Sequence, residues 1–237
     1  MDVDAGAYAK QVEDYLARRN RGHLIRIVGP AFDLVMGWQE RGVPLNVVCR
    51  GIDRYCERVE AKGSRSRRPA QIQFCEADVL DVFDEWRRAT GVSMWDKASA
   101  LAEDATGHAD GRSSLPAHLE RVVARLTALR SSGGLGLGDA LDAVVREIDA
   151  SRGTAKTLRG EARARLLERL RELDGVLLTA VRERMEPAAL RALHVEAEAE
   201  LAPFRERMPR DAYEQSRRAA SDRLLRERTK LPAIALD

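Results

Sequence analysis

The chain has 237 residues, of which 44% are hydrophobic and 33% are charged, and its net charge is +2. This length fits one or two domains with buried cores, and this composition excludes a disordered acidic or basic tail protein. Only five of the forty basic residues are lysine, an arginine excess that a GC-rich genome produces by itself. Arginine therefore indicates nucleic-acid binding only where it clusters.

The cysteine content and the hydropathy of the chain limit the class of protein further. Three cysteines are too few, and odd in number, for a disulfide scaffold. No apolar run approaches the roughly 18–20 residues that a membrane span needs. The acidic start of the chain differs from the basic and then apolar start of a secretory signal. We expect a soluble, cytoplasmic protein that does not enter a membrane.

The first part of the chain is predicted to be a compact helical domain over residues 1–103. Nine of the eleven aromatic residues in the whole chain precede position 96, and aromatic side chains fill compact cores. Residues 7–19 carry an apolar stripe at helical spacing. Further helices are predicted to begin at Pro30, Pro44 and about Glu76. Gly42 is predicted to follow the end of the helix that begins at Pro30. Residues 24–28 and 71–75 are predicted to be short extended pieces.

The helix that begins near Glu76 carries several carboxylates among its apolar residues. Asp78 and its acidic neighbours spread around the helix, whereas calcium and magnesium sites draw on loops and several elements. Acidic residues early in a helix also complement its dipole. These residues are therefore expected to form a solvated face.

The second part of the chain is predicted to be an extended helical region over residues 115–237. A polar, glycine-bearing linker is expected at 104–114, and a second, glycine-rich linker at 131–138. Leucine and alanine recur at spacings of three and four through long helices, and Pro187 and Pro209 each begin a new one. Such stripes suit antiparallel hairpins or a small bundle. The predicted fold class is all-α.

No motif predicts a metal, a cofactor or a catalytic centre. Cys49 and Cys56 are seven residues apart on one helix, about 10 Å along its axis, which is too far for two thiolates on one zinc ion. They and Cys75 are expected to be buried apolar residues. His194 is expected to pair with Glu198 on a helix surface. Because no nucleophile and base are paired, we expect the protein not to be an enzyme.

A basic loop is the strongest candidate for a binding site. Four basic residues fall within seven positions flanked by glycine and proline: Lys62, Arg65, Arg67 and Arg68. Such loops contact phosphates without reading sequence. The alternative is an ordinary solvated loop, since the surrounding domain is nearly neutral. The final helix, residues 209–230, is a second basic candidate whose alternative is a solvated coiled-coil flank.

The N-terminal part resembles the helical DnaD-type domain of bacterial replication-initiation and primosome proteins. The resemblance covers residues 11–90. Its motif residues here are Tyr15, Gly22, Pro30, Trp38, Gly42, Leu45, Val48 and Ile52, then the loop from Lys62, then Ile72, Val79 and Trp86. The family's tyrosine–isoleucine element is replaced by residues 71–75. The resemblance implies DNA binding and protein contact in a replication or remodelling assembly, without catalysis.

Two functional hypotheses follow. In the first, the chain is a non-enzymatic adaptor that contacts nucleic-acid phosphates, non-specifically, through the basic loop. Its C-terminal helices then bind a protein partner or a second copy, with Leu231, Ile234 and Leu236 of the apolar tail as contact residues. In the second, the chain is a pure protein–protein scaffold or assembly subunit that binds no nucleic acid, and the basic loop is inert.

Overall fold

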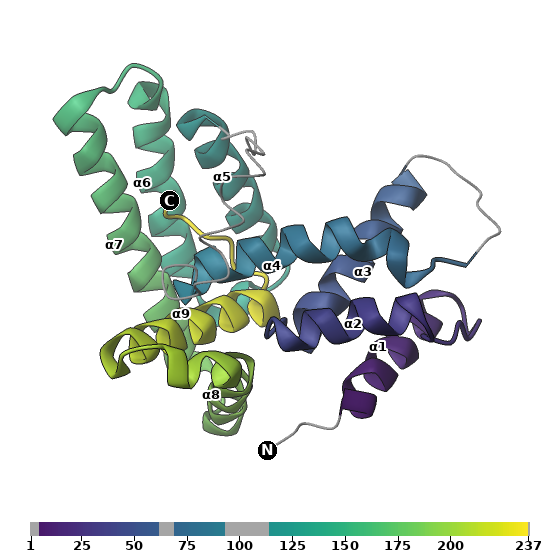
Figure 1. The fold of residues 1–237 in the computed structure, drawn as a ribbon. Helices are drawn as coiled ribbons and strands as arrows, with labels where there is room; N and C mark the ends of the chain where they lie inside the picture. The colour runs from purple at the N-terminus through teal and green to yellow at the C-terminus, as the bar shows by residue number, and fades with distance from the viewer. Residues whose placement is uncertain (1–4, 62–68, 93–113, 237) are drawn as a thin grey trace. The chain divides into compact units, whose positions relative to one another are not determined.

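The computed structural model describes residues 5–61, 69–92 and 114–236. Every regular element within these ranges is a helix (Figure 1), which confirms the all-α prediction. The chain divides into two compact units. Of the described residues, the first unit holds 5–92 and 200–216, and the second holds 114–199 and 217–236. None of the described helices is both long and apolar enough to cross a membrane.

The first unit follows the predicted order of helices closely. Its elements are α1 (Ala5–Arg19), α2 (Pro30–Glu40), α3 (Leu45–Ala61), the 3₁₀ helix η1 (Ile72–Cys75) and α4 (Glu76–Thr90). Pro30 stands at the start of α2, as predicted. Gly42 follows α2 with a φ of 77°, and a Cβ there would lie 3.0 Å from the ring of Phe204. Both its backbone conformation and its close neighbour therefore favour glycine.

The prediction of an extended piece at 71–75 is wrong. Residues 72–75 form η1, and residues 23–28 take no regular structure. The reason lies in the spacing of the buried side chains. Ile72 and Cys75 are three residues apart, are 2% and 0% exposed, and a 3₁₀ turn places residues three apart on one face. Burial does not alternate along this segment, since Phe74, two residues after Ile72, is 59% exposed.

Helices α3 and α4 pack with their backbones in close approach. A Cβ on Gly51 would lie 2.5 Å from the Cα of Val79, so only a residue without a side chain fits at this crossing. Beside the crossing, the rings of Phe83 and Trp86 stack with centroids 5.8 Å apart. This pair of helices forms the centre of the first unit's core.

Residues 200–216 complete this core, although the sequence analysis assigned them to the C-terminal region. The ring of Phe204 lies 5.7 Å from that of Trp86 and is 1% exposed. The buried carboxylate of Glu200 accepts a hydrogen bond from Trp86 Nε1 at 2.9 Å and another from the side-chain amide of Asn46. The expected linker at 104–114 lies outside the described residues except for Ser114.

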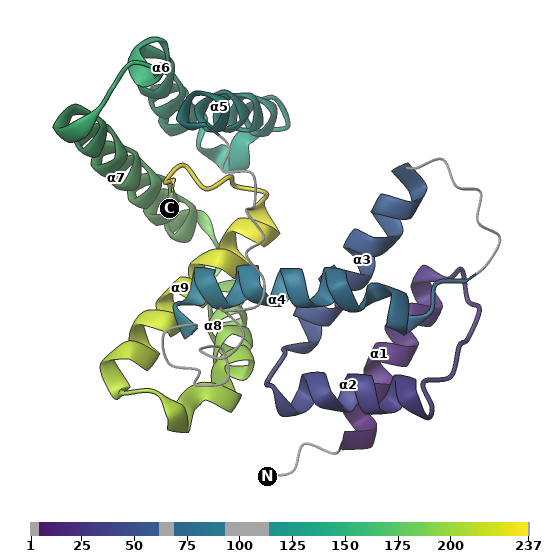
Figure 2. The same cartoon turned by 45° about the horizontal axis from the view of Figure 1, so that its top comes forward.

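The second unit is built from helices with leucine-rich seams. Its elements are α5 (Leu115–Ser131), the short 3₁₀ turn η3 (Gly134–Gly136), α6 (Gly138–Ala155), α7 (Gly160–Arg184), most of α8 (Pro187–Leu201) and the C-terminal part of α9 (Arg210–Thr229). Helices α5, α6 and α7 lie side by side (Figures 1 and 2). Residues on the predicted stripes, among them Leu119, Leu141 and Leu177, are fully buried.

Candidate nucleic-acid interface

The predicted basic loop lies outside the described residues, and so do its four candidate side chains, Lys62, Arg65, Arg67 and Arg68. Its described neighbours are the C-terminal end of α3, at Ala61, and the segment that begins at Pro69. The site is therefore built from the residues around these two ends.

A reciprocal pair of hydrogen bonds anchors the chain that leaves the loop. The Asn20 side-chain amide donates to the backbone oxygen of Ala70 at 2.9 Å, and its carbonyl oxygen accepts from the backbone N–H of Ala70 at 2.8 Å. Asn20 follows the last turn of α1 and is 9% exposed. Because both groups of one amide are satisfied by one peptide unit, this contact fixes residue 70 beside the end of α1.

The segments that Asn20 joins carry no acidic residue. Residues 15–32 contain Arg18, Arg19, Arg21 and Arg26, and residues 61–75 contain the four basic residues of the loop. Within each segment the side-chain charge is positive, although acidic residues stand next to both in the sequence: Asp14 and Asp33 beside the first, Glu60 and Glu76 beside the second. The structure therefore brings residue 70, two positions after the basic loop, beside the acid-free segment 15–32.

The four arginines of residues 15–32 differ in what they contact. Arg19 forms an ion pair with Asp53 at 2.8 Å. The Arg18 guanidinium lies over the ring of Tyr15, 5.3 Å from its centroid. Within the described part of the chain, Arg21 and Arg26 are exposed, and their side chains make neither a hydrogen bond nor an ion pair. Arg21 and Arg26 are thus the side chains here that are available to an anionic ligand.

The carboxylates that reach this region are engaged. Glu13 accepts the backbone N–H of Ile27 at 2.7 Å. Asp53 accepts the hydroxyl of Tyr15 at 2.7 Å in addition to its ion pair with Arg19. Burial and the hydrogen bond to Asp53 raise the pKa of Tyr15 above its ordinary value, so that this hydroxyl stays protonated. Glu13 and Asp53 thus hold the local fold, whereas Asp14 and Asp33, which flank residues 15–32, are exposed.

The same two segments carry the large apolar side chains that the first unit exposes in its described residues. Leu24, Val28 and Phe74 are 56%, 66% and 59% exposed. Between the segments lies a cavity of about 200 Å³ whose walls include Arg26 and Gln73. An exposed aromatic ring beside basic groups is the combination on which unstacked nucleic-acid bases stack.

Four candidate residues of this surface were not expected from the sequence: Asn20, Arg21, Arg26 and Phe74. The absence of any acidic residue from 15–32 is the signal that points to the arginines. No sequence signal pairs Asn20 with Ala70, because that contact depends on the tertiary fold.

Other arginines of the first unit are occupied by carboxylates. Arg54 makes a two-pronged contact with Glu85, at 2.7 and 2.8 Å, and Arg58 binds Asp78 at 2.5 Å. The expectation that Asp78 lies on a solvated face is wrong, since it is 6% exposed. The physical reason is that Arg58 on α3 supplies the charge that a buried carboxylate requires.

The second basic candidate, the final helix, uses its arginines within the protein. Arg217 contacts Glu198, Arg226 contacts Asp174, and Arg228 contacts Glu196. These ion pairs favour the alternative interpretation, in which the final helix is a solvated coiled-coil flank and not a binding site. The sequence predicted a pair between His194 and Glu198. In the structure Glu198 pairs with Arg217 instead.

The apolar tail is folded against its own unit. Leu231 and Ile234 are 4% and 0% exposed, and Leu236 is half-buried. The backbone N–H of Ile234 donates to Asp174 at 2.8 Å, and its oxygen lies 3.0 Å from Nε2 of His118. The protein itself covers these side chains. Partner binding through them stays a prediction that would require the tail to leave Asp174.

The three cysteines are free thiols. Cys75 is buried, as predicted, whereas Cys49 and Cys56 are half-buried. Burial raises the pKa of the Cys49 thiol to about 11 and that of Cys75 to about 12. Among the described residues no group of three or more histidine, cysteine, aspartate and glutamate side chains could hold a metal ion.

Comparisons with models of protein families, with curated proteins and with solved structures give no match for this chain. The resemblance of residues 11–90 to the DnaD-type domain therefore stays a prediction.

Proposed function

We propose that this protein is a non-enzymatic adaptor that binds nucleic-acid phosphates through the surface formed by residues 15–32 and 61–75. The observation that carries the proposal is the Asn20–Ala70 contact, which joins two acid-free segments with eight basic residues between them. Phosphate contacts of this kind supply affinity and no base specificity, so the binding is expected to be independent of sequence.

The exposed ring of Phe74 supports a preference for single strands. In a duplex the bases are stacked on each other, whereas a single strand offers their faces to an aromatic side chain. Leu24 and Val28, on the other segment, are exposed apolar side chains as well. We expect single-stranded DNA or RNA to bind more tightly than a duplex of equal length.

The test is fluorescence anisotropy of labelled single- and double-stranded DNA at about 50 mM and about 200 mM salt. If four phosphates are contacted, affinity for duplex DNA falls about a hundredfold between these conditions. Two charge-reversal variants probe the two segments: Arg65→Glu/Arg67→Glu/Arg68→Glu in the loop and Arg21→Glu/Arg26→Glu in the described surface. Each is expected to weaken binding at least tenfold and to flatten the salt dependence.

A matched control carries the same change of charge elsewhere. Arg165 and Arg171 lie exposed on α7 in the second unit, each in an ion pair on its own helix. Arg165→Glu/Arg171→Glu is expected to leave binding unchanged within about twofold, because exposed pairs contribute little to stability. Equal weakening by this control would show that only net charge matters, and would remove the assignment of the surface.

The second candidate function is a protein scaffold without nucleic-acid binding. It is favoured by the ion pairs of α9, which leave that helix with few arginines for a ligand. Absence of binding to either DNA at about 50 mM salt would support this candidate over the adaptor.

A further inference from the structure

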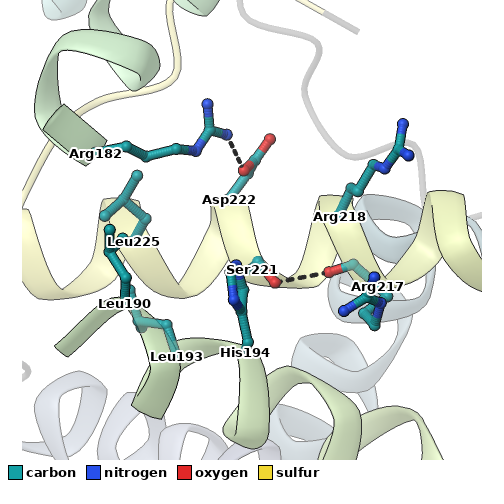
Figure 3. Close-up of a pocket in the computed structure, with 9 residues that line it drawn as sticks. All are labelled: Arg182, Leu190, Leu193, His194, Arg217, Arg218, Ser221, Asp222 and Leu225. Atoms are coloured by element: carbon teal, nitrogen blue, oxygen red, sulfur yellow. Dashed lines mark hydrogen bonds and ion pairs between the residues drawn. The ribbon is translucent and has the colours of Figure 1, made fainter. Parts of the chain in front are cut away.

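The second unit contains a pocket that neither functional hypothesis uses. Its cavity volume is about 410 Å³, within the range of small-molecule sites. Three helices supply its walls: α7 with Arg182, α8 with Leu190, Leu193 and His194, and α9 with Arg217, Arg218, Ser221, Asp222 and Leu225. Figure 3 shows these side chains around the groove beside α9.

One side of the pocket is apolar. Leu193 and Leu225 are 2% and 1% exposed and form its floor, and Leu190 is half-buried beside them. In Figure 3 the three leucines lie together at one end of the groove. Aliphatic side chains without an aromatic ring suit an aliphatic ligand body better than a flat heterocycle.

The other side is cationic, and its charges are not equally available. Arg182 is paired with Asp222, and Arg217 donates to Glu198 at 3.3 Å. Arg218 is exposed and makes neither a hydrogen bond nor an ion pair within the described residues. In Figure 3 its guanidinium lies at the end of the groove away from the leucines.

The charge of the ligand's head group follows from this arrangement. Asp222 and Glu198 neutralise two of the three arginines, so one positive charge remains for the ligand. One guanidinium balances one negative charge, so a singly charged head group matches it better than a doubly charged phosphate. Ser221 already donates its hydroxyl hydrogen to the backbone oxygen of Arg217 at 2.8 Å, so it offers only its lone pairs to a ligand.

We propose that this pocket binds a small aliphatic monocarboxylate, with its chain on Leu190, Leu193 and Leu225 and its carboxylate on Arg218. The site is independent of the nucleic-acid surface, because its residues all belong to the second unit. An experiment can therefore disprove this carboxylate site without disproving the proposed adaptor function, and the reverse also holds.

The experiment is isothermal titration of the full chain with octanoate and with octanamide, which has the same chain and no charge. Octanoate is expected to bind saturably at one site, and octanamide at least tenfold more weakly. Arg218→Gln is expected to weaken octanoate about tenfold and to leave octanamide unchanged. Because Arg218 is exposed, this substitution removes the charge without disturbing the core.

The control variant is Arg191→Gln. Arg191 is exposed on α8, three residues before His194, and does not line the pocket. Unchanged octanoate binding in this variant, with weakening in Arg218→Gln, supports the site. Equal affinities for octanoate and octanamide, equal loss in both variants, or no saturation below about 10 mM would overturn it.

Discussion

Both units pair arginines with carboxylates, but the first unit also has a stretch of arginines without any acid. On the second unit, side chains such as Arg169, Arg226 and Arg228 meet carboxylates of neighbouring helices or turns. On the first unit, residues 15–32 hold four arginines and no acidic residue, and Arg21 and Arg26 have no carboxylate partner among the described residues. The number of arginines therefore says little about binding. The carboxylates within reach decide which arginines a ligand can use.

The cores differ as well. The first unit's core is aromatic and is closed by a segment from far along the chain, since Phe204 and Glu200 both contact Trp86. The second unit's core is a set of leucine seams between helices, and a polar contact at Asp174 holds its tail. The first core therefore depends on a few contacts between large side chains, and the second on many contacts between leucines.

The largest expected effect follows from Phe204. Phe204→Ala removes a ring that is 1% exposed against Trp86, and such a cavity costs about 3–5 kcal/mol of the free energy of unfolding. Because all three tryptophans precede position 96, tryptophan fluorescence during urea unfolding follows the first unit. We expect a lower midpoint in that signal.

Phe74→Ala is the control for this variant, since Phe74 is 59% exposed and its loss is expected to change the midpoint little. A Phe204→Ala protein with the midpoint of the unchanged chain would contradict the assignment of residues 200–216 to the first unit.

A smaller effect is expected at Asp174, in the second unit. Asp174→Ala leaves Arg226 and the backbone N–H of Ile234 without their shared acceptor. Breaking a largely buried pair costs about 3 kcal/mol, less where solvent reaches one partner. We expect the tail to detach, which hydrogen exchange at the Ile234 amide measures directly, while tryptophan emission stays constant.

Asp142→Ala provides the comparison. Asp142 forms an ion pair with Arg130 in which both side chains are about half exposed, and exposed pairs contribute little. Slow exchange at Ile234 that survives Asp174→Ala would show that apolar packing alone holds the tail.

The smallest effect concerns pH and the first unit. Burial raises the pKa of Cys49 to about 11 and of Cys75 to about 12, from an ordinary value of 9. The folded state therefore holds these protons more tightly than the unfolded state. The resulting stabilisation is complete below pH 9 and is lost as pH rises from about 9 to about 12.

Alkylation by iodoacetamide checks this prediction, since only the thiolate reacts. At pH 8 Cys49 is expected to react about a hundredfold more slowly than a thiol of ordinary pKa, and the difference disappears in urea. Rapid labelling of Cys49 in the folded protein at pH 8 would contradict the raised pKa of this half-buried thiol.

The elements that sequence reasoning found are those whose signal is local. Pro30 at a helix start, Gly42 after a helix end and the leucine stripes of the second unit depend on neighbours within a few residues. The partners of Glu200, Asp78 and Asn20 lie on other elements, and composition does not reveal them. For the same reason the tail at Ile234 looked free in the sequence, although Asp174 and His118 hold it.

The crossing of α3 and α4 has a consequence for the protein's evolution. Any nucleotide change that replaces Gly51 introduces a Cβ 2.5 Å from the backbone of Val79, whereas a Cβ at Gly37 or Gly175 meets nothing within 4 Å. Helical glycines of identical chemistry thus face very different selection. Among descendants of this gene, position 51 is expected to stay glycine while positions 37 and 175 drift, with alanine a favoured replacement there.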